Sequence, residues 1–93
     1  MRDVDQIIEL VKQKFPAVKV EQLKVSHTAD DDGIWFFSLP PNRKEIQIES
    51  SNGMCPFVVE HHGMRTTATE AFGESVDRTA ELVSDYLLQI SSE

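Results

Sequence analysis

Histidine and cysteine are the residues of this chain best suited to metal chemistry. His61 and His62 are adjacent in the fourth predicted strand, and Cys55 precedes that strand. His27 lies in the first predicted strand, with the second and third strands between it and His61. Adjacent residues of a strand point to opposite faces, so His61 and His62 cannot hold one ion while the strand continues. Zinc sites usually have recognisable ligand spacing, such as a cysteine pair, and this chain has a single cysteine. We therefore expect no metal site and place the two histidines at the end of a strand.

The aspartate run Asp30-Asp31-Asp32 suggests calcium at first sight. An EF-hand loop, however, spaces its carboxylates at alternate positions and ends in a bidentate glutamate. Adjacent aspartates before Gly33 instead favour a hairpin turn. We assign this run to a turn.

Cys55 is the candidate nucleophile. A nucleophilic cysteine needs a lowered pKa, usually from a helix N-terminus or an adjacent base, and a hairpin implies neither. Unpaired cysteines are often buried, so we expect Cys55 to fill space beside Ser50. The chain also lacks a glycine-rich phosphate loop, a serine elbow and a paired-carboxylate motif. We predict no catalytic residue and no cofactor; an enzyme using Cys55 with His61 or His62, or a metal-binding regulator, is the alternative.

The length and the net charge of the chain limit the number of domains and the classes of partner that it can bind. A chain of 93 residues has room for one domain, residues 1–93. Nine Lys and Arg against sixteen Asp and Glu give a net charge of −7, which argues against binding to nucleic-acid phosphates or an anionic membrane. A basic protein partner is favoured instead. Because no signal peptide, long apolar segment or cysteine pair is present, we expect a cytoplasmic protein.

Two helices are predicted at the ends of the chain. Apolar residues at steps of three and four predict a helix over residues 3–15, which Asp3 can cap and Pro16 ends. A second apolar stripe from Phe72 to Ile90 predicts a helix over residues 69–91. It begins at a capping-box spacing, Thr67 to Glu70.

Between these helices the apolar period changes to two, which predicts strands over residues 18–28, 34–39, 44–51 and 57–62. The chain is thus expected to form an α+β fold with two layers in the order α-β-β-β-β-α. Its sheet is a four-stranded antiparallel meander, and both helices pack on one face.

The turns predict how the strands align. Asn52-Gly53 predicts a type I′ hairpin that pairs Ile48 with Phe57 and Ile46 with Val59. An even loop around residues 41–43 puts Trp35, Phe37 and Leu39 on the same core face. A loop over residues 31–33 sets Val25 opposite Leu39 and His27 opposite Phe37.

This alignment leaves apolar side chains among carboxylates on the other side of the sheet, which we call the outer face. Such a patch is typical of an interface. Its residues are the candidate protein-binding surface: Ile34, Phe36, Glu45, Gln47, Glu49, Val58, Glu60 and His62. We expect a small acidic protein-binding module, such as an adaptor, a chaperone or an inhibitor of a basic partner, or one that forms a weak homodimer through this face.

Overall fold

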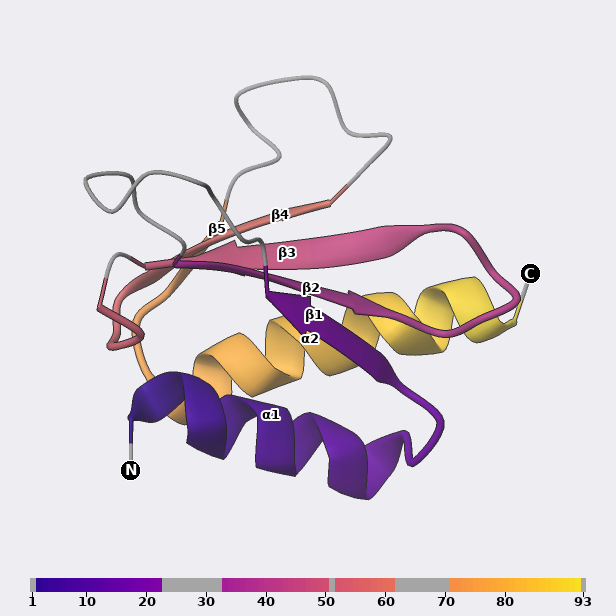
Figure 1. Cartoon of the computed structure of the whole chain (residues 1–93), viewed down its shortest axis with the longest axis horizontal. Helices are drawn as coiled ribbons and strands as arrows, with labels where there is room; N and C mark the ends of the chain where they lie inside the picture. The colour runs from indigo at the N-terminus through magenta and orange to yellow at the C-terminus, as the bar shows by residue number, and fades with distance from the viewer. Residues whose placement is uncertain (1, 23–32, 51, 62–70, 93) are drawn as a thin grey trace.

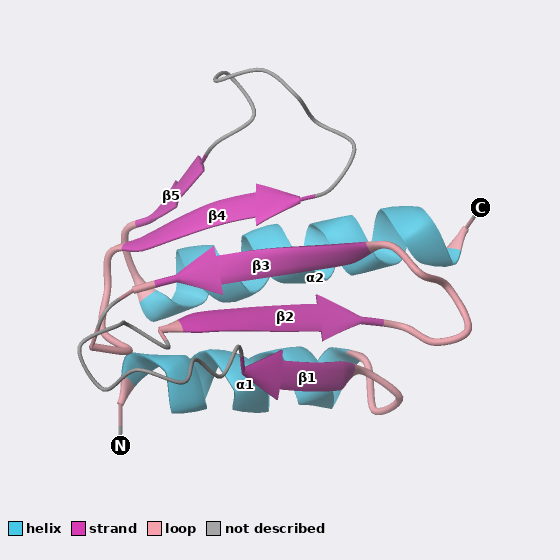
Figure 2. Ribbon diagram, turned by 45° about the horizontal axis from the view of Figure 1, so that its top comes forward, coloured by secondary structure: helices cyan, strands magenta, loops and turns pink. Residues whose placement is uncertain are grey.

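One antiparallel sheet carries both helices on the same face, so the molecule has two layers (Figure 1; Figure 2). The structure, a computed structural model, describes residues 2–22, 33–50, 52–61 and 71–92. Its elements are, in order, α1 (Asp3–Lys14), β1 (Lys19–Gln22), β2 (Ile34–Ser38), β3 (Glu45–Glu49), β4 (Phe57–His61), β5 (Ala71–Gly73) and α2 (Val76–Ser91).

The predicted α+β fold is confirmed: β1 to β4 form an antiparallel meander, with a helix before and a helix after it. The helix over 3–15 and the strands over 34–39, 44–51 and 57–62 were placed to within one or two residues. Of the strand predicted over 18–28, the structure describes β1 at 19–22. A fifth strand, β5, pairs with β4 and was not predicted. Three residues are too few to show the alternation that indicates a strand.

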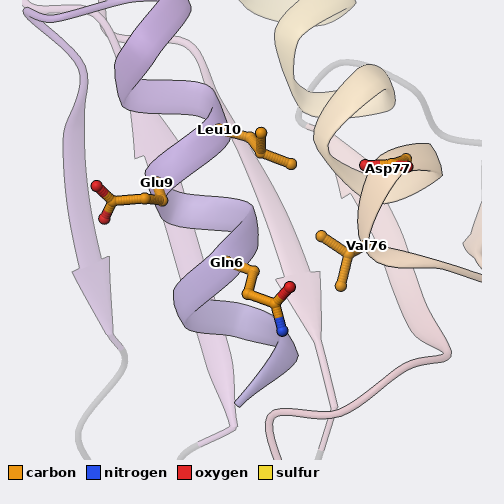
Figure 3. Close-up of a pocket in the computed structure, with 5 residues that line it drawn as sticks. All are labelled: Gln6, Glu9, Leu10, Val76 and Asp77. Carbon is orange, nitrogen blue, oxygen red and sulfur yellow. The ribbon is translucent and has the colours of Figure 1, made fainter. Parts of the chain in front are cut away.

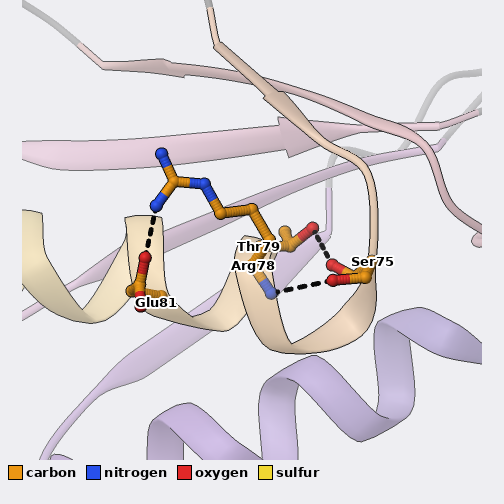
Figure 4. A network of polar contacts seen from close by, with 4 residues as sticks. All are labelled: Ser75, Arg78, Thr79 and Glu81. Atoms are coloured by element: carbon orange, nitrogen blue, oxygen red, sulfur yellow. Dashed lines mark hydrogen bonds and ion pairs between the residues drawn. The ribbon is translucent and has the colours of Figure 1, made fainter.

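The C-terminal helix begins later than predicted, at Val76 rather than near residue 69. Ser75 is its N-cap, and the Ser75 hydroxyl accepts a hydrogen bond of 3.1 Å from the backbone N–H of Arg78 (Figure 4). The Thr79 hydroxyl donates back to the Ser75 carbonyl at 2.7 Å, and Arg78 forms an ion pair with Glu81. These bonds fix the first turn, whereas the predicted capping pair, Thr67 and Glu70, lies outside the described residues.

The start of α1 also differs from the prediction. Arg2, whose backbone is extended directly before the helix, is the N-cap. The Asp3 carboxylate instead accepts a hydrogen bond of 2.9 Å from the backbone N–H of Cys55. The predicted end is confirmed, since the helix stops at Lys14, before Pro16. The predicted apolar stripe is buried at Val4, Ile7 and Val11.

The alignment of β2 with β3 follows the prediction. Trp35 lies opposite Ile48 and Phe37 opposite Ile46, so an even number of residues connects the two strands. Trp35 is 4% exposed and Phe37 is fully buried. They form the core with the apolar residues of the other strands and of the helices: Ile46, Ile48, Phe57, Val59, Val4, Ile7, Val11, Ala80, Val83, Tyr86, Leu87 and Ile90.

The predicted alignment of the first strand is wrong. Val20 lies opposite Phe37, and Gln22 lies opposite Trp35. His27 therefore cannot occupy the position opposite Phe37, and both His27 and Val25 lie outside the described residues. The error arose because the sequence was aligned from its turn at Asp31-Asp32-Gly33, whereas the observed pairing is between residues 19–22 and 35–38.

The predicted alignment of β3 with β4 is also wrong, by two residues. Ile48 lies opposite Val59 rather than opposite Phe57, so Ile46 is not paired with Val59. The connection is longer than a two-residue turn and includes residues 50–56. Because the shift is even, every side chain keeps its predicted face.

The connection between β3 and β4 is held by a side chain and by α1. Among the described residues only Gly53 has a positive φ, +72°, so Asn52 does not take the type I′ conformation. The Asn52 side chain instead accepts a hydrogen bond of 3.0 Å from the Met54 backbone N–H. The Gly53 carbonyl accepts a bond of 2.9 Å from the Val4 N–H. The loop is thus docked on the first turn of α1.

Candidate functional site

Cys55 lies two residues before β4 and is half-buried beside the first turn of α1. Burial raises the pKa of its thiol, and the hydrogen bond and negative charge of Asp3 raise it further, against a lowering contribution from the Thr79 hydroxyl. A raised pKa leaves less thiolate at neutral pH, and thiolate is the nucleophilic form. The surroundings of Cys55 therefore oppose nucleophilic chemistry.

His61 lies at the opposite end of β4 from Cys55. Four residue steps of about 3.3 Å separate Phe57 from His61, about 13 Å along the strand, and Cys55 precedes Phe57. The structure therefore does not bring the cysteine and this histidine together. His62 lies outside the described residues.

The His61 ring is on the helix side of the sheet. It stacks on the Tyr86 ring of α2 with centroids 4.3 Å apart and planes tilted by 33°. Its Nδ1 is buried and has no hydrogen-bond partner among the described residues. Within those residues no three histidine, cysteine, aspartate or glutamate side chains gather closely enough to hold a metal ion. His27 and Asp30–Asp32 lie outside them.

The structure brings together the predicted outer face, apart from His62. The backbone register places its residues in two neighbouring cross-strand rows: Phe36, Gln47 and Glu60 in one, and Ile34, Glu49 and Val58 in the other. Glu45 lies two residues before Gln47 on β3, on the same face. Both helices pack on the other side of the sheet, so no described helix covers these rows (Figure 2).

The outer face combines partly covered apolar groups with exposed charges. Ile34, Phe36 and Val58 are half-buried, and no described element packs over them. The three carboxylates Glu45, Glu49 and Glu60 are exposed, and none of them forms an ion pair with another described residue. Ile34 and Phe36 are neighbours on β2, whereas Val58 lies two strands away on β4, with Glu49 between it and Ile34. Apolar side chains are therefore interspersed with carboxylates on this face.

A small hollow opens on this face. Its volume is about 130 Å³, and it is lined by Phe36, Glu45, Gln47, Glu60 and His61. Because the His61 ring contacts Tyr86 on the helix side, the other four residues define the chemistry of the hollow. The sequence placed all four on one face, but it carried no signal of a depression there.

A second and larger depression, of about 420 Å³, lies between α1 and α2 and was missed by sequence reasoning. Leu10 and Val76 point toward each other across it, Gln6 extends toward α2, and Glu9 points away from α2 (Figure 3). Asp77 completes the lining. The groove exists because the two helices pack side by side, and neither apolar stripe alone reveals which residues flank the contact.

Comparison of the chain with models of known protein families, with curated protein sequences and with solved structures finds no match. None of the helices within the described segments is long and apolar enough to cross a membrane.

Proposed function

We propose that this chain is a small acidic protein-binding domain and that its outer face binds a basic partner protein in the cytoplasm. The observation that carries the proposal is the presence of the apolar side chains Ile34, Phe36 and Val58, interspersed with exposed carboxylates, on the sheet face opposite the helices. Covering apolar surface favours association by about 25 cal/mol for each Å² removed from water. The free thiol of Cys55 is compatible with a reducing compartment.

Charge favours a basic partner over a second copy of the chain. A homodimer stacked about a two-fold axis would bring Glu45, Glu49 and Glu60 close to their own copies, and two molecules of charge −7 repel each other. Basic side chains of a partner protein that face these three glutamates would instead be attracted to them. The two uses of the face respond oppositely to salt: screening weakens binding of a basic partner and strengthens self-association.

The proposal is tested with the chain immobilised and exposed to an extract of its native cells, in three forms: wild type, Phe36→Glu and Leu88→Glu. Both substitutions add one negative charge, and Leu88 is 62% exposed on α2, away from the outer face. We expect one basic protein to be retained stoichiometrically by the wild type and by Leu88→Glu, to be lost with Phe36→Glu, and to dissociate as salt rises.

The control for this experiment shows that the Phe36→Glu variant still folds. Phe36→Glu must keep the circular dichroism spectrum of the wild type, because Phe36 borders solvent. Retention of the same partner by Phe36→Glu contradicts the proposal. If Leu88→Glu alone loses the partner, the acidic side of α2 is the binding surface instead. Association of the purified chain with itself that strengthens with salt identifies the face as a homodimer interface.

A further inference from the structure

The hollow on the outer face has walls of two chemical kinds. The Phe36 side chain borders one side and the Glu60 carboxylate the other, with Gln47 between them in the same cross-strand row. Neighbouring strands are about 4.8 Å apart, so Phe36 and Glu60 stand about 10 Å apart across Gln47. Glu45 lies about 7 Å from Gln47 along β3, at the end of the hollow.

The size and charge of this space select its occupant. The hollow, of about 130 Å³, is small and lies between side chains of three neighbouring strands, which suits one terminal group of a long side chain rather than a helix. Two carboxylates without ion-pair partners among the described residues line it, so that group is a cation. Lys19, a basic residue on the same face, is held by Glu21 at 3.0 Å and does not neutralise these carboxylates.

An aromatic wall favours a planar cation over a compact one. A guanidinium group stacks flat on an aromatic ring and directs several N–H donors outward in its plane, whereas an ammonium is a strongly hydrated point charge. With its face against Phe36, a guanidinium can donate to Glu60, to Glu45 and to the side-chain oxygen of Gln47. The remaining apolar residues of the face, Ile34 and Val58, are available to the aliphatic parts of the partner.

We propose that this hollow binds an arginine side chain of the partner protein, an inference that rests on the proposed function of the outer face. Arginine supplies the positive charge, and the apolar side chains of the outer face supply the surrounding contact area. The hollow gives the domain a preference among basic partners that net charge alone would not provide.

The probes are capped tetra-arginine, tetra-lysine and tetra-citrulline peptides, titrated into the full chain and followed by nitrogen-15 NMR at constant ionic strength. Citrulline keeps the shape of arginine and removes its charge. The side-chain amide signal of Gln47 reports on the hollow, and the indole signal of Trp35, which is buried on the opposite face, is the internal control. We expect the arginine peptide to shift the Gln47 signal, to bind severalfold more tightly than the lysine peptide, and to leave Trp35 in place.

Substitutions in the hollow test whether the arginine peptide binds there. Replacing Glu45 and Glu60 together by Gln should raise the Kd of the arginine peptide about tenfold, since each exposed ion pair contributes only a few-fold. The matched control replaces Glu9 by Gln and Asp85 by Asn, which removes the same charge from exposed positions on the helices. It should change the Kd by less than about twofold. Phe36→Leu should remove most of the preference for arginine over lysine.

Three results would overturn the inference: equal affinity for the arginine and lysine peptides, no shift of the Gln47 signal, or an equal loss of affinity in the outer-face and control variants. The proposed function is tested separately, by whether the variants retain the protein partner. If Phe36→Glu loses that partner while the Glu45→Gln, Glu60→Gln double variant retains it at full affinity, the outer face binds the partner but the hollow does not bind its arginine.

Discussion

Two adjacent phenylalanines test the face assignment on which the proposed function depends. Phe36 and Phe37 differ by one position in β2 and point to opposite sides of the sheet. Phe37 is fully buried between the sheet and the helices, opposite Ile46, whereas Phe36 is half-buried on the outer face, opposite Gln47. We replace each by Ala and compare the free energies of unfolding.

The structure sets a large difference between the two substitutions. Phe37→Ala removes a ring from a closed core and leaves a cavity, at a cost of about 3–5 kcal/mol. Phe36→Ala loses about half of the 1.5–3 kcal/mol that complete burial of such a side chain contributes, about 1 kcal/mol, and leaves no cavity. At about 0.05–0.15 kcal/mol per residue, a chain of 93 residues unfolds with about 5–14 kcal/mol. Phe37→Ala therefore removes a large part of the total.

The assay is urea denaturation, followed both by Trp35 fluorescence and by far-ultraviolet circular dichroism. With a slope of about 2 kcal/mol per molar urea, the midpoint should fall by about 2 M for Phe37→Ala and by about 0.5 M for Phe36→Ala. Trp35 is 4% exposed, so its emission should shift to longer wavelength as each variant unfolds. Equal losses for the two variants, or a larger loss for Phe36→Ala, would show that Phe36 belongs to the core and would refute the assignment of the outer face.

Three further substitutions test local parts of the structure. Gly53→Ala should cost about 1–2 kcal/mol in urea denaturation, because φ is +72° and an added Cβ would lie 3.2 Å from the side chain of Val4. An unchanged midpoint would contradict the docked loop. Asp3→Asn should lower the pKa of the Cys55 thiol and speed its alkylation by iodoacetamide at pH 8, while a slower reaction would contradict the raising effect of Asp3. Since the folded thiol has the raised pKa, its contribution to stability is present at low pH and is lost as pH rises through that pKa. Ser75→Ala should cost about 1 kcal/mol by loss of the N-cap, and no cost would mean that α2 begins earlier.

Much of the local architecture was predictable because it depends on neighbouring residues. Steps of three and four placed α1, alternation placed β3, and the even-length connection around residues 41–43 placed Trp35 and Phe37 of β2 on the core face. The side of the sheet to which a side chain points changes only when the strand alignment shifts by an odd number of residues. The predicted side was therefore correct although the alignment of β3 with β4 was wrong by two residues. The carboxylates and apolar residues of the outer face were likewise grouped correctly.

The sequence by itself thus determined the periodic elements, their inner and outer faces and the acidic charge. The tertiary structure decided what depends on distant residues. It docked the 50–56 loop on α1 through Gly53 and Cys55, and so replaced the expected two-residue turn. It also added β5 to β4, and it shaped the hollow from side chains of β2, β3 and β4. Periodicity is a property of the local backbone, whereas strand alignment, loop length and concavity depend on contacts between residues far apart in the chain.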